Sequence, residues 1–148
     1  VAARRQLVDE VRTRHGILSR RQVSGDQVRL SAECELTVYR VAQEALSNVV
    51  RHAQATHTRV DLHFGGHVVL TVTDDGCGIA ATSSTSASSG GRRGLIGMGE
   101  RVNLVGGTLD VRARMPHGTV VRVMILPRNP RPDLDVGHST SGLPGSSC

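Results

Sequence analysis

The chain has 148 residues, a length that fits one domain with a hydrophobic core of its own. Hydrophobic residues make up 38% and charged residues 21%, which argues against a wholly disordered chain. All 18 basic residues are arginine, so mechanisms that need a lysine, such as a Schiff base or a Walker-type phosphate loop, are excluded. The net charge of +5 is concentrated near the N-terminus, and almost no aromatic residues are present to stack bases. We therefore expect no nucleic-acid partner.

The N-terminal part predicts a helix, a strand and a second, longer helix. Residues 2–14 have a sparse apolar stripe, Gly16 ends this helix, and residues 17–23 are expected to form a strand. Ser31 is the predicted N-cap of a helix that runs to about Ala53. The apolar side of this helix, at about 100° per residue, consists of Val38, Val41, Ala42, Ala45, Leu46 and Val49.

Two strands are expected next, at residues 59–64 and 68–74, joined by a hairpin at Gly65-Gly66. Because residues two apart share a face, Asp74 continues the apolar face of its strand, which we expect to be covered. A carboxylate that emerges from a covered face needs a partner, and a ligand would supply one.

The C-terminal half begins with residues 80–93, which have no apolar period and are expected to form a mobile lid. A helix from Leu95 to Val105 follows and ends at Gly106-Gly107. Two closing strands are predicted at residues 108–115 and 119–126. One face of the first of these strands is expected to carry Leu109, Val111, Ala113 and Met115.

This order of elements predicts an α/β (α+β) two-layer sandwich, with a mainly antiparallel mixed sheet and helices on one face. We expect residues 1–29 to lead into the domain and residues 30–127 to form its core. Residues 128–148 are rich in proline, glycine and serine, and we expect a disordered tail there.

The cysteines and the hydropathy pattern indicate the cellular compartment in which we expect this chain. Cys34, Cys77 and Cys148 are widely spaced and odd in number, which indicates a reducing compartment rather than a disulfide framework. No stretch approaches the roughly 18 apolar residues of a membrane span, and no signal peptide is recognised. We expect a cytoplasmic fragment, monomeric on its own and without direct membrane contact, while a longer parent protein remains free to carry a membrane anchor.

Three polar stretches are candidates for a functional site. The long helix carries Glu44, Asn48 and His52 on one side, residues 74–79 (DDGCGI) follow a strand, and residues 94–101 are expected to open the last helix. Each stretch alone has a simpler interpretation: a solvated helix face, a tight turn or a flexible hinge. Together their residue types suit a nucleotide, because glycines and a helix N-terminus let backbone amides approach an anion closely.

The side chains in these stretches fit the other parts of a nucleotide. The amide oxygen of Asn48 is a suitable ligand for Mg²⁺, which also keeps waters and phosphate oxygens. The carboxylate of Asp74 only accepts hydrogen bonds when ionised, so it would recognise an exocyclic amine.

In this order and spacing, the stretches resemble the ATP-binding domain (HATPase_c, Bergerat fold) shared by gyrase, the heat-shock-type chaperone, MutL and histidine kinases. The likeness is greatest to sensor histidine kinases that pair with NarL-type response regulators. It covers roughly residues 30–127 and rests on residues 40–48 with His52-Ala53, residues 74–79, 94–98 and 100–102, Leu104, residues 106–109, and Gly118-Thr119.

The resemblance implies that Asp74 hydrogen-bonds the adenine amino group of ATP. Gly78 would let the base lie close, and Thr119 would support Asp74. Asn48 would coordinate the Mg²⁺ that bridges the phosphates, and Glu44 would lie near the metal and the γ-phosphate as the catalytic residue. The other ATP-binding residues implied are His52, Gly76, Ile79, Gly94, Leu95, Gly97 and Met98.

Some assignments stay open at the level of sequence. His52 would lie near the phosphates or serve as a hydrogen-bonded structural residue. Arg92 and Arg93 would touch the phosphates or be solvated in the lid. Gly99 stands where the family usually has a larger residue, and Cys77 is either an incidental small residue or a redox switch.

None of the seven histidines is followed by an acidic residue, as the phosphoacceptor of a histidine kinase normally is. The resemblance therefore implies a catalytic ATP-binding domain that presents Mg-ATP to a histidine on a separate dimerisation and phosphoacceptor hairpin. A NarL-type response regulator would be the downstream partner. Two alternatives remain: a serine-protein kinase of the anti-sigma type, and a nucleotide-gated interaction module without turnover.

Overall fold

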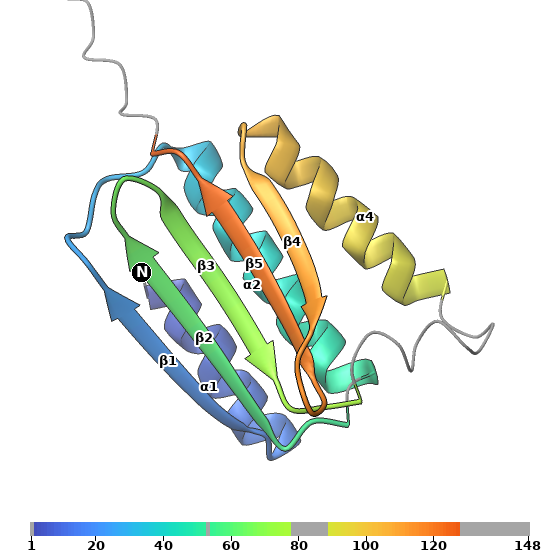
Figure 1. Ribbon diagram of the computed structural model, residues 1–148. Helices are drawn as coiled ribbons and strands as arrows, with labels where there is room; N and C mark the ends of the chain where they lie inside the picture. Colours follow the sequence, from blue (N-terminus) through green and yellow to red (C-terminus); the bar gives the residue numbers. More distant parts are fainter. Residues whose placement is uncertain (1, 53, 78–88, 128–148) are drawn as a thin grey trace, which may run out of the picture.

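The computed structural model describes residues 2–52, 54–77 and 89–127. These residues form a five-stranded sheet and three helices (Figure 1). The elements in chain order are α1 (Ala2–His15), β1 (Leu18–Ser24), α2 (Ala32–His52), β2 (His57–Phe64), β3 (Val68–Asp74), α4 (Ser89–Leu104), β4 (Thr108–Ala113) and β5 (Thr119–Ile125).

The sheet has the strand order β1-β2-β3-β5-β4. Strand β1 is parallel to β2, and the other three pairings are antiparallel. Figure 1 shows α1 and α2 side by side behind the sheet, with α4 next to α2 and close to β4. The predicted fold class, a two-layer sandwich with a mainly antiparallel mixed sheet, is therefore confirmed.

The core lies between the helices and the covered face of the sheet, and it is almost entirely aliphatic. The predicted apolar side of α2 is buried throughout. The alternation predicted for β2 and β3 is also confirmed, because every second residue of each strand is buried. The strand residues in the core are Val60, Leu62, Phe64, Val68, Leu70, Val72, Val121, Val123 and Ile125.

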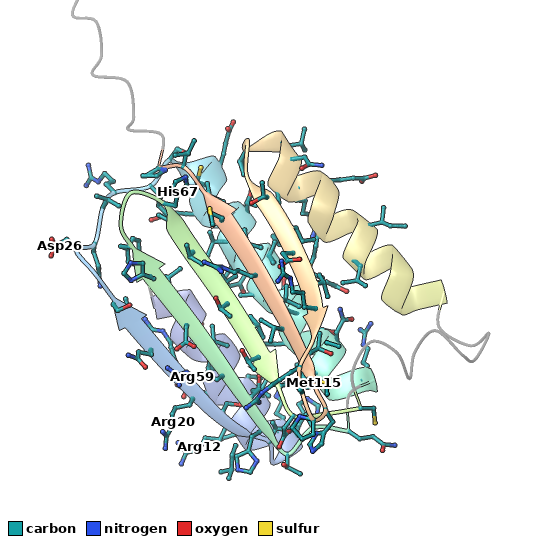
Figure 2. The ribbon with its side chains drawn as sticks, viewed as in Figure 1. Arg12, Arg20, Asp26, Arg59, His67 and Met115 are labelled. Carbon is teal, nitrogen blue, oxygen red and sulfur yellow. The ribbon has the colours of Figure 1, made fainter. Side chains whose placement is uncertain are left out.

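The opposite face of the sheet is largely polar, its side chains are exposed or half-buried, and no described helix covers it. Arg20 of β1 and Arg59 of β2 are register partners on this face, and Figure 2 labels both. The Arg59 guanidinium donates to Gln22 at 2.7 Å and to Asp61 at 2.8 Å. These side chains bond to one another across the strands, so this face is solvated and adds nothing to the core.

The predicted ends of the two N-terminal helices are confirmed. Gly16 has a φ of +65°, a left-handed conformation that favours glycine, and it follows the last residue of α1. The Ser31 Oγ accepts a hydrogen bond from the Cys34 amide at 3.3 Å, which makes Ser31 the N-cap of α2.

Helix α4 begins earlier than predicted, at Ser89 rather than Leu95. Residues 89–93 of the expected lid are therefore helical, and residues 80–88 lie outside the described residues. Three glycines between residues 89 and 94 lower helix propensity, which is why the sequence indicated a loop. No proline interrupts this segment, and the buried Met98 and Val102 hold the helix in the core.

Strand β4 ends earlier than predicted, at Ala113 rather than Met115. The chain turns there, and the turn is closed by a hydrogen bond from the Arg114 amide to the Gly118 carbonyl at 3.0 Å. Ala113 still shares a face of β4 with Leu109 and Val111, as predicted, whereas Met115 lies beyond the strand and is exposed. Figure 2 shows Met115 at this turn, near the end of the sheet where β3 also ends.

Candidate functional site

Asp74 is the last residue of β3, and its side chain lies on the covered face of the sheet, as predicted. Only 5% of the residue is exposed. Its Oδ1 accepts a hydrogen bond from the Gly76 amide at 2.8 Å, and the nearby Thr119 amide favours the ionised carboxylate. An ionised carboxylate has about four acceptor positions, so Asp74 keeps acceptor capacity for a ligand.

The environment of Asp74 raises its pKa above the ordinary value. Burial is the main cause, and the negative charge of Asp75 adds to it. The hydrogen bonds from the Gly76 and Thr119 amides and the positive charge of Arg114 act in the opposite direction. A buried carboxylate with a raised pKa at the end of a strand is a common property of binding sites.

The start of β5 lies directly beside Asp74. Thr119 is the register partner of Asp74, and Gly118 has a φ of +116°. A Cβ added at Gly118 would overlap the carbonyl oxygen of Asp74, so only glycine allows this approach. The structure therefore brings together Asp74, Gly76 and Thr119 of the predicted adenine site.

Asp75, which the sequence analysis did not single out, has the richest set of hydrogen bonds near the site. Its carboxylate accepts from the amides of Thr56 and His57, from the Thr56 hydroxyl, and from the His57 ring. Partial burial alone would raise the pKa of Asp75, but these hydrogen bonds outweigh it and hold the pKa well below its usual range. The only signal in the sequence was a second acidic residue directly after Asp74.

Glu44 and Asn48 lie on the side of α2 that faces α4. They are four residues apart, so they are neighbours on one side of the helix, and both are half-buried. A Cβ added at Gly94 would overlap the Glu44 carboxylate. The first and third predicted stretches are therefore in contact, although residues 44 and 94 are far apart in the sequence.

The third stretch lies within α4 rather than at its start. In this conformation Gly94, Leu95 and Gly97 are at least six residues into the helix, so their amides face carbonyls of the preceding turn. Leu95 packs against the core, and Met98 is completely buried. The helix begins at Ser89, one to two turns before the N-terminus that was predicted at Leu95.

All three stretches meet at one end of the molecule. Figure 1 shows the end of β3, the C-terminal part of α2 and the N-terminal part of α4 at the same end of the sandwich. Gly78 and Ile79 lie outside the described residues, as do the side chains of His52, Arg92 and Arg93. Within the described ranges, no helix is long and apolar enough to cross a membrane.

Comparison with known proteins shows the family to which the chain is related. Residues 33–130 match the family of histidine kinase-, DNA gyrase B-, and HSP90-like ATPases. The chain belongs to this ATPase family. The resemblance stated from the sequence is therefore confirmed, and the three stretches fall within the matched range.

Curated relatives of this ATPase domain are sensor histidine kinases. The chain is 34% identical over 131 residues to the sensor histidine kinase YxjM of Bacillus subtilis. It is 31% identical over 125 residues to the oxygen sensor histidine kinase NreB of Staphylococcus carnosus. Each alignment covers 84% of this chain but only 30% and 35% of the relatives, so the chain spans about a third of their length.

A solved structure with the same fold is the histidine kinase AdeS of Acinetobacter baumannii. The TM-score is 0.67 at 13% identity, and the match covers 86% of this chain and 64% of that one. At this identity the likeness concerns the fold, and it agrees with the sandwich described above.

The donor set of this ATPase domain fits a metal held mainly by a nucleotide. Among residues 2–52, 54–77 and 89–127, no three His, Cys, Asp or Glu side chains gather to form a metal site. Mg²⁺ commonly takes one or two protein ligands and completes its shell with waters and substrate phosphates. A single half-buried amide oxygen, that of Asn48, is compatible with this mode of binding.

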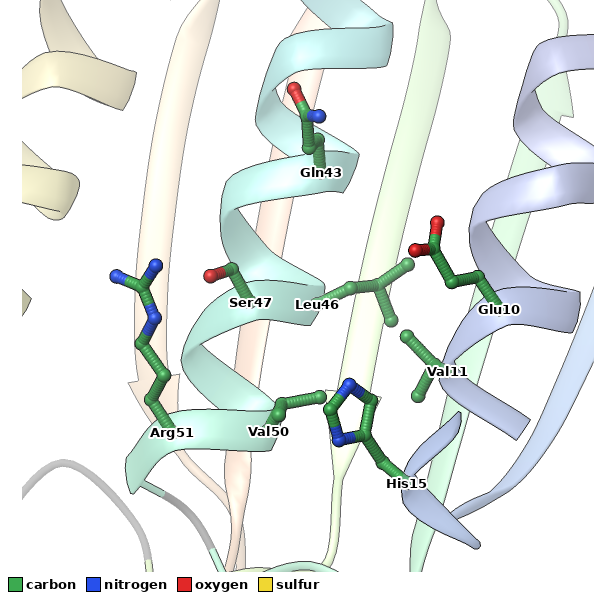
Figure 3. A pocket seen from close by; sticks show the side chains of 8 residues that line it. All are labelled: Glu10, Val11, His15, Gln43, Leu46, Ser47, Val50 and Arg51. Carbon is green, nitrogen blue, oxygen red and sulfur yellow. The ribbon is translucent and has the colours of Figure 1, made fainter. Parts of the chain in front are cut away.

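A separate groove of about 340 Å³ lies on the opposite side of α2, against α1. Figure 3 shows its apolar floor of Val11, Leu46 and Val50, with polar side chains at the rim. Glu10 at this rim is paired with Arg14 at 2.8 Å. The groove faces away from Glu44 and Asn48, so it is not part of the candidate nucleotide site.

Proposed function

We propose that this chain is the catalytic ATP-binding domain of a sensor histidine kinase, which binds Mg-ATP and presents the γ-phosphate to a histidine on a separate hairpin. The observation that carries the proposal is the buried Asp74 carboxylate, held by the Gly76 amide at the end of the molecule where α2 and α4 also meet. The relatives named as sensor histidine kinases support the choice of kinase over other members of the family.

The base would be selected by Asp74. Its free acceptor positions would receive the hydrogen bond from the adenine 6-amino group, while the Gly76 amide holds the carboxylate and Thr119, the register partner of Asp74, would support it. Burial makes this hydrogen bond strong, because the carboxylate exchanges little water for the ligand. Gly78 and Ile79 would contact the base from the loop that follows.

The phosphates would lie over the side of α2 that faces α4. Bound Mg²⁺ would neutralise the phosphate charge and leave the γ-phosphorus open to in-line attack. Asn48 would be its protein ligand, and Glu44 would be the catalytic acid near the γ-phosphate, held against Gly94. The remaining proposed ATP-binding residues are His52, Gly94, Leu95, Gly97 and Met98, and the side chain of Met98 is in the core.

Phosphotransfer by the proposed domain would require partners outside this chain. Its partners would be the dimerisation and phosphoacceptor hairpin and a response regulator of the NarL type. We propose a cytoplasmic, monomeric domain with its ATP-binding core at residues 30–127, a range close to the matched residues 33–130. Helix α1 and β1 add to the same core and sheet, since Val8 and Val11 are buried and β1 pairs with β2.

The proposal is tested by phosphotransfer in trans. The chain is incubated with ATP labelled at the γ-phosphate and with the phosphoacceptor hairpin of the parent kinase, and a hairpin with its histidine changed to alanine is the control. Acid-labile label on the first hairpin alone supports the proposal. Nucleotide binding without transfer to the hairpin would contradict it and favour an interaction module.

A further inference from the structure

The Asp75 carboxylate joins the end of β3 to the start of β2. Its Oδ1 accepts from the Thr56 and His57 amides, both at 2.9 Å. Its Oδ2 accepts from the Thr56 hydroxyl at 2.6 Å and lies 3.1 Å from the His57 Nδ1. Both oxygens of Asp75 thus accept hydrogen bonds from the chain itself. Asp75 therefore holds two segments together, whereas Asp74 keeps acceptor capacity for a ligand.

The backbone of Asp75 is held on the other flank by the turn between β4 and β5. Its carbonyl oxygen lies 2.7 Å from the Nδ1 of His117, and since a carbonyl only accepts, His117 donates from this nitrogen. The next residue, Gly118, packs against the Asp74 carbonyl. Residues Thr56, His57, Asp75 and His117, here called the Asp75 cluster, therefore connect three segments that are distant in sequence.

The Asp75 cluster acts on the adenine site through the backbone. Asp75 stands between Asp74 and Gly76, and the Gly76 amide donates the hydrogen bond that orients the Asp74 carboxylate. Fixing Asp75 on both flanks fixes the direction of that amide. Without the cluster, the turn after β3 would be free to rotate the amide away from Asp74.

We propose that Asp75 is a positioning residue for base selection, which sets the preference for adenine by holding the turn that orients Asp74. The inference rests on the proposed nucleotide function. Adenine presents a donor at position 6 and guanine presents a carbonyl oxygen there, so a fixed carboxylate accepts from the first and repels the second. A carboxylate that turns freely discriminates less, because it can move away from the guanine oxygen.

The test compares ATP and GTP affinities by calorimetry for a set of variants. Asp75→Ala removes all the hydrogen bonds of the carboxylate, and we expect the ratio of GTP to ATP dissociation constants to fall about tenfold. Thr56→Val removes the shortest of these bonds, with an expected fall of about threefold. Asp75→Asn keeps an acceptor for both amides and should recover most of the ratio of the parent chain.

Thr71→Val is the matched control, because it makes the same threonine-to-valine change in the middle of β3. It should leave the ratio unchanged. A role in stability alone would lower the melting temperature of Asp75→Ala and leave its ratio equal to that of the parent, and this result would overturn the proposal.

A second measurement needs no nucleotide, so it separates this inference from the proposed function. Hydrogen exchange of the Gly76 amide is followed by NMR in the nucleotide-free chain, and Asp75→Ala should accelerate it about tenfold relative to Thr71→Val. Unchanged exchange would overturn the positioning role. Faster exchange in a chain that binds neither nucleotide would instead contradict the nucleotide function while leaving the coupling of Asp75 to the turn intact.

Discussion

The adenine side and the phosphate side of the proposed site are built in different ways. Around Asp74, three strand ends meet, and hydrogen bonds from distant segments fix the carboxylate and its neighbour Asp75. On the phosphate side, Glu44 and Asn48 lie half-buried on one helix and meet α4 at Gly94. In the proposed site, base recognition would therefore be built into the sheet, whereas phosphate binding would depend on how α2 and α4 are placed.

The largest effect is expected from Asp74→Asn. The amide nitrogen of asparagine is a donor, and it would face the adenine amine, which is also a donor. We expect ATP affinity measured by calorimetry to fall about a hundredfold, the loss of a charge-assisted hydrogen bond plus a donor left unpaired. The exposed Asp110→Asn on β4 serves as the control and should bind ATP like the parent chain. Equal binding by Asp74→Asn would remove the basis of the adenine site.

On the phosphate side, Gly94→Ala is expected to weaken ATP binding about tenfold. The new methyl group would overlap the Glu44 carboxylate, so either α4 or the Glu44 side chain must move to relieve the overlap. Gly99→Ala in the same helix is the control, because the added Cβ would meet only a Leu109 methyl at an ordinary contact distance of 3.9 Å.

The control has an effect of its own on stability. Alanine is a better helix former than glycine, so Gly99→Ala should raise the free energy of unfolding by up to about 1 kcal/mol without changing nucleotide affinity. If Gly94→Ala bound ATP as tightly as Gly99→Ala, the contact between α2 and α4 would have no part in the site.

Asn48→Ala tests the metal on the same side. It removes the amide oxygen that would hold Mg²⁺, and we expect ATP affinity in the presence of Mg²⁺ to fall about fivefold. Titrations with and without Mg²⁺ should show that the loss of affinity occurs mainly when the metal is present. Asn103→Ala, on an exposed position of α4, is the control. A uniform loss with and without the metal would argue that Asn48 does not hold it.

The smallest effect concerns stability and pH on the adenine side. Hydrogen bonds lower the pKa of Asp75 in the folded chain, so its ionised form stabilises the fold above the ordinary value of 3.8, and this contribution is lost as the pH falls below it. At pH 7 the parent chain should exceed Asp75→Asn by about 1 kcal/mol in free energy of unfolding. Urea denaturation should show this advantage shrinking below about pH 4. If the difference in free energy of unfolding between the parent chain and Asp75→Asn did not change with pH, the lowered pKa of Asp75 would be contradicted.

The sequence predicted best what depends on local periodicity. Alternation in β2 and β3 placed Asp74 on the covered face, and the Ser31 cap set the start of α2. These features follow from side-chain direction and from one local hydrogen bond, so they need no knowledge of the rest of the chain.

Contacts between segments that are distant in the sequence could not be predicted from local patterns. The Asp75 cluster joins residues 56, 57 and 117 to residue 75, and the overlap at Gly94 requires knowing how α4 lies on α2. The start of α4 was misplaced for a related reason, since packing of its buried face outweighs the low helix propensity of its glycines.

The most direct test of the account is a calorimetric titration of the chain with ATP and with GTP, both in the presence of Mg²⁺. We expect ATP binding in the micromolar to sub-millimolar range and clearly weaker GTP binding, because the Asp74 carboxylate is already oriented in the fold. Equal affinities for ATP and GTP, or no binding by a chain that circular dichroism shows to be folded, would contradict it.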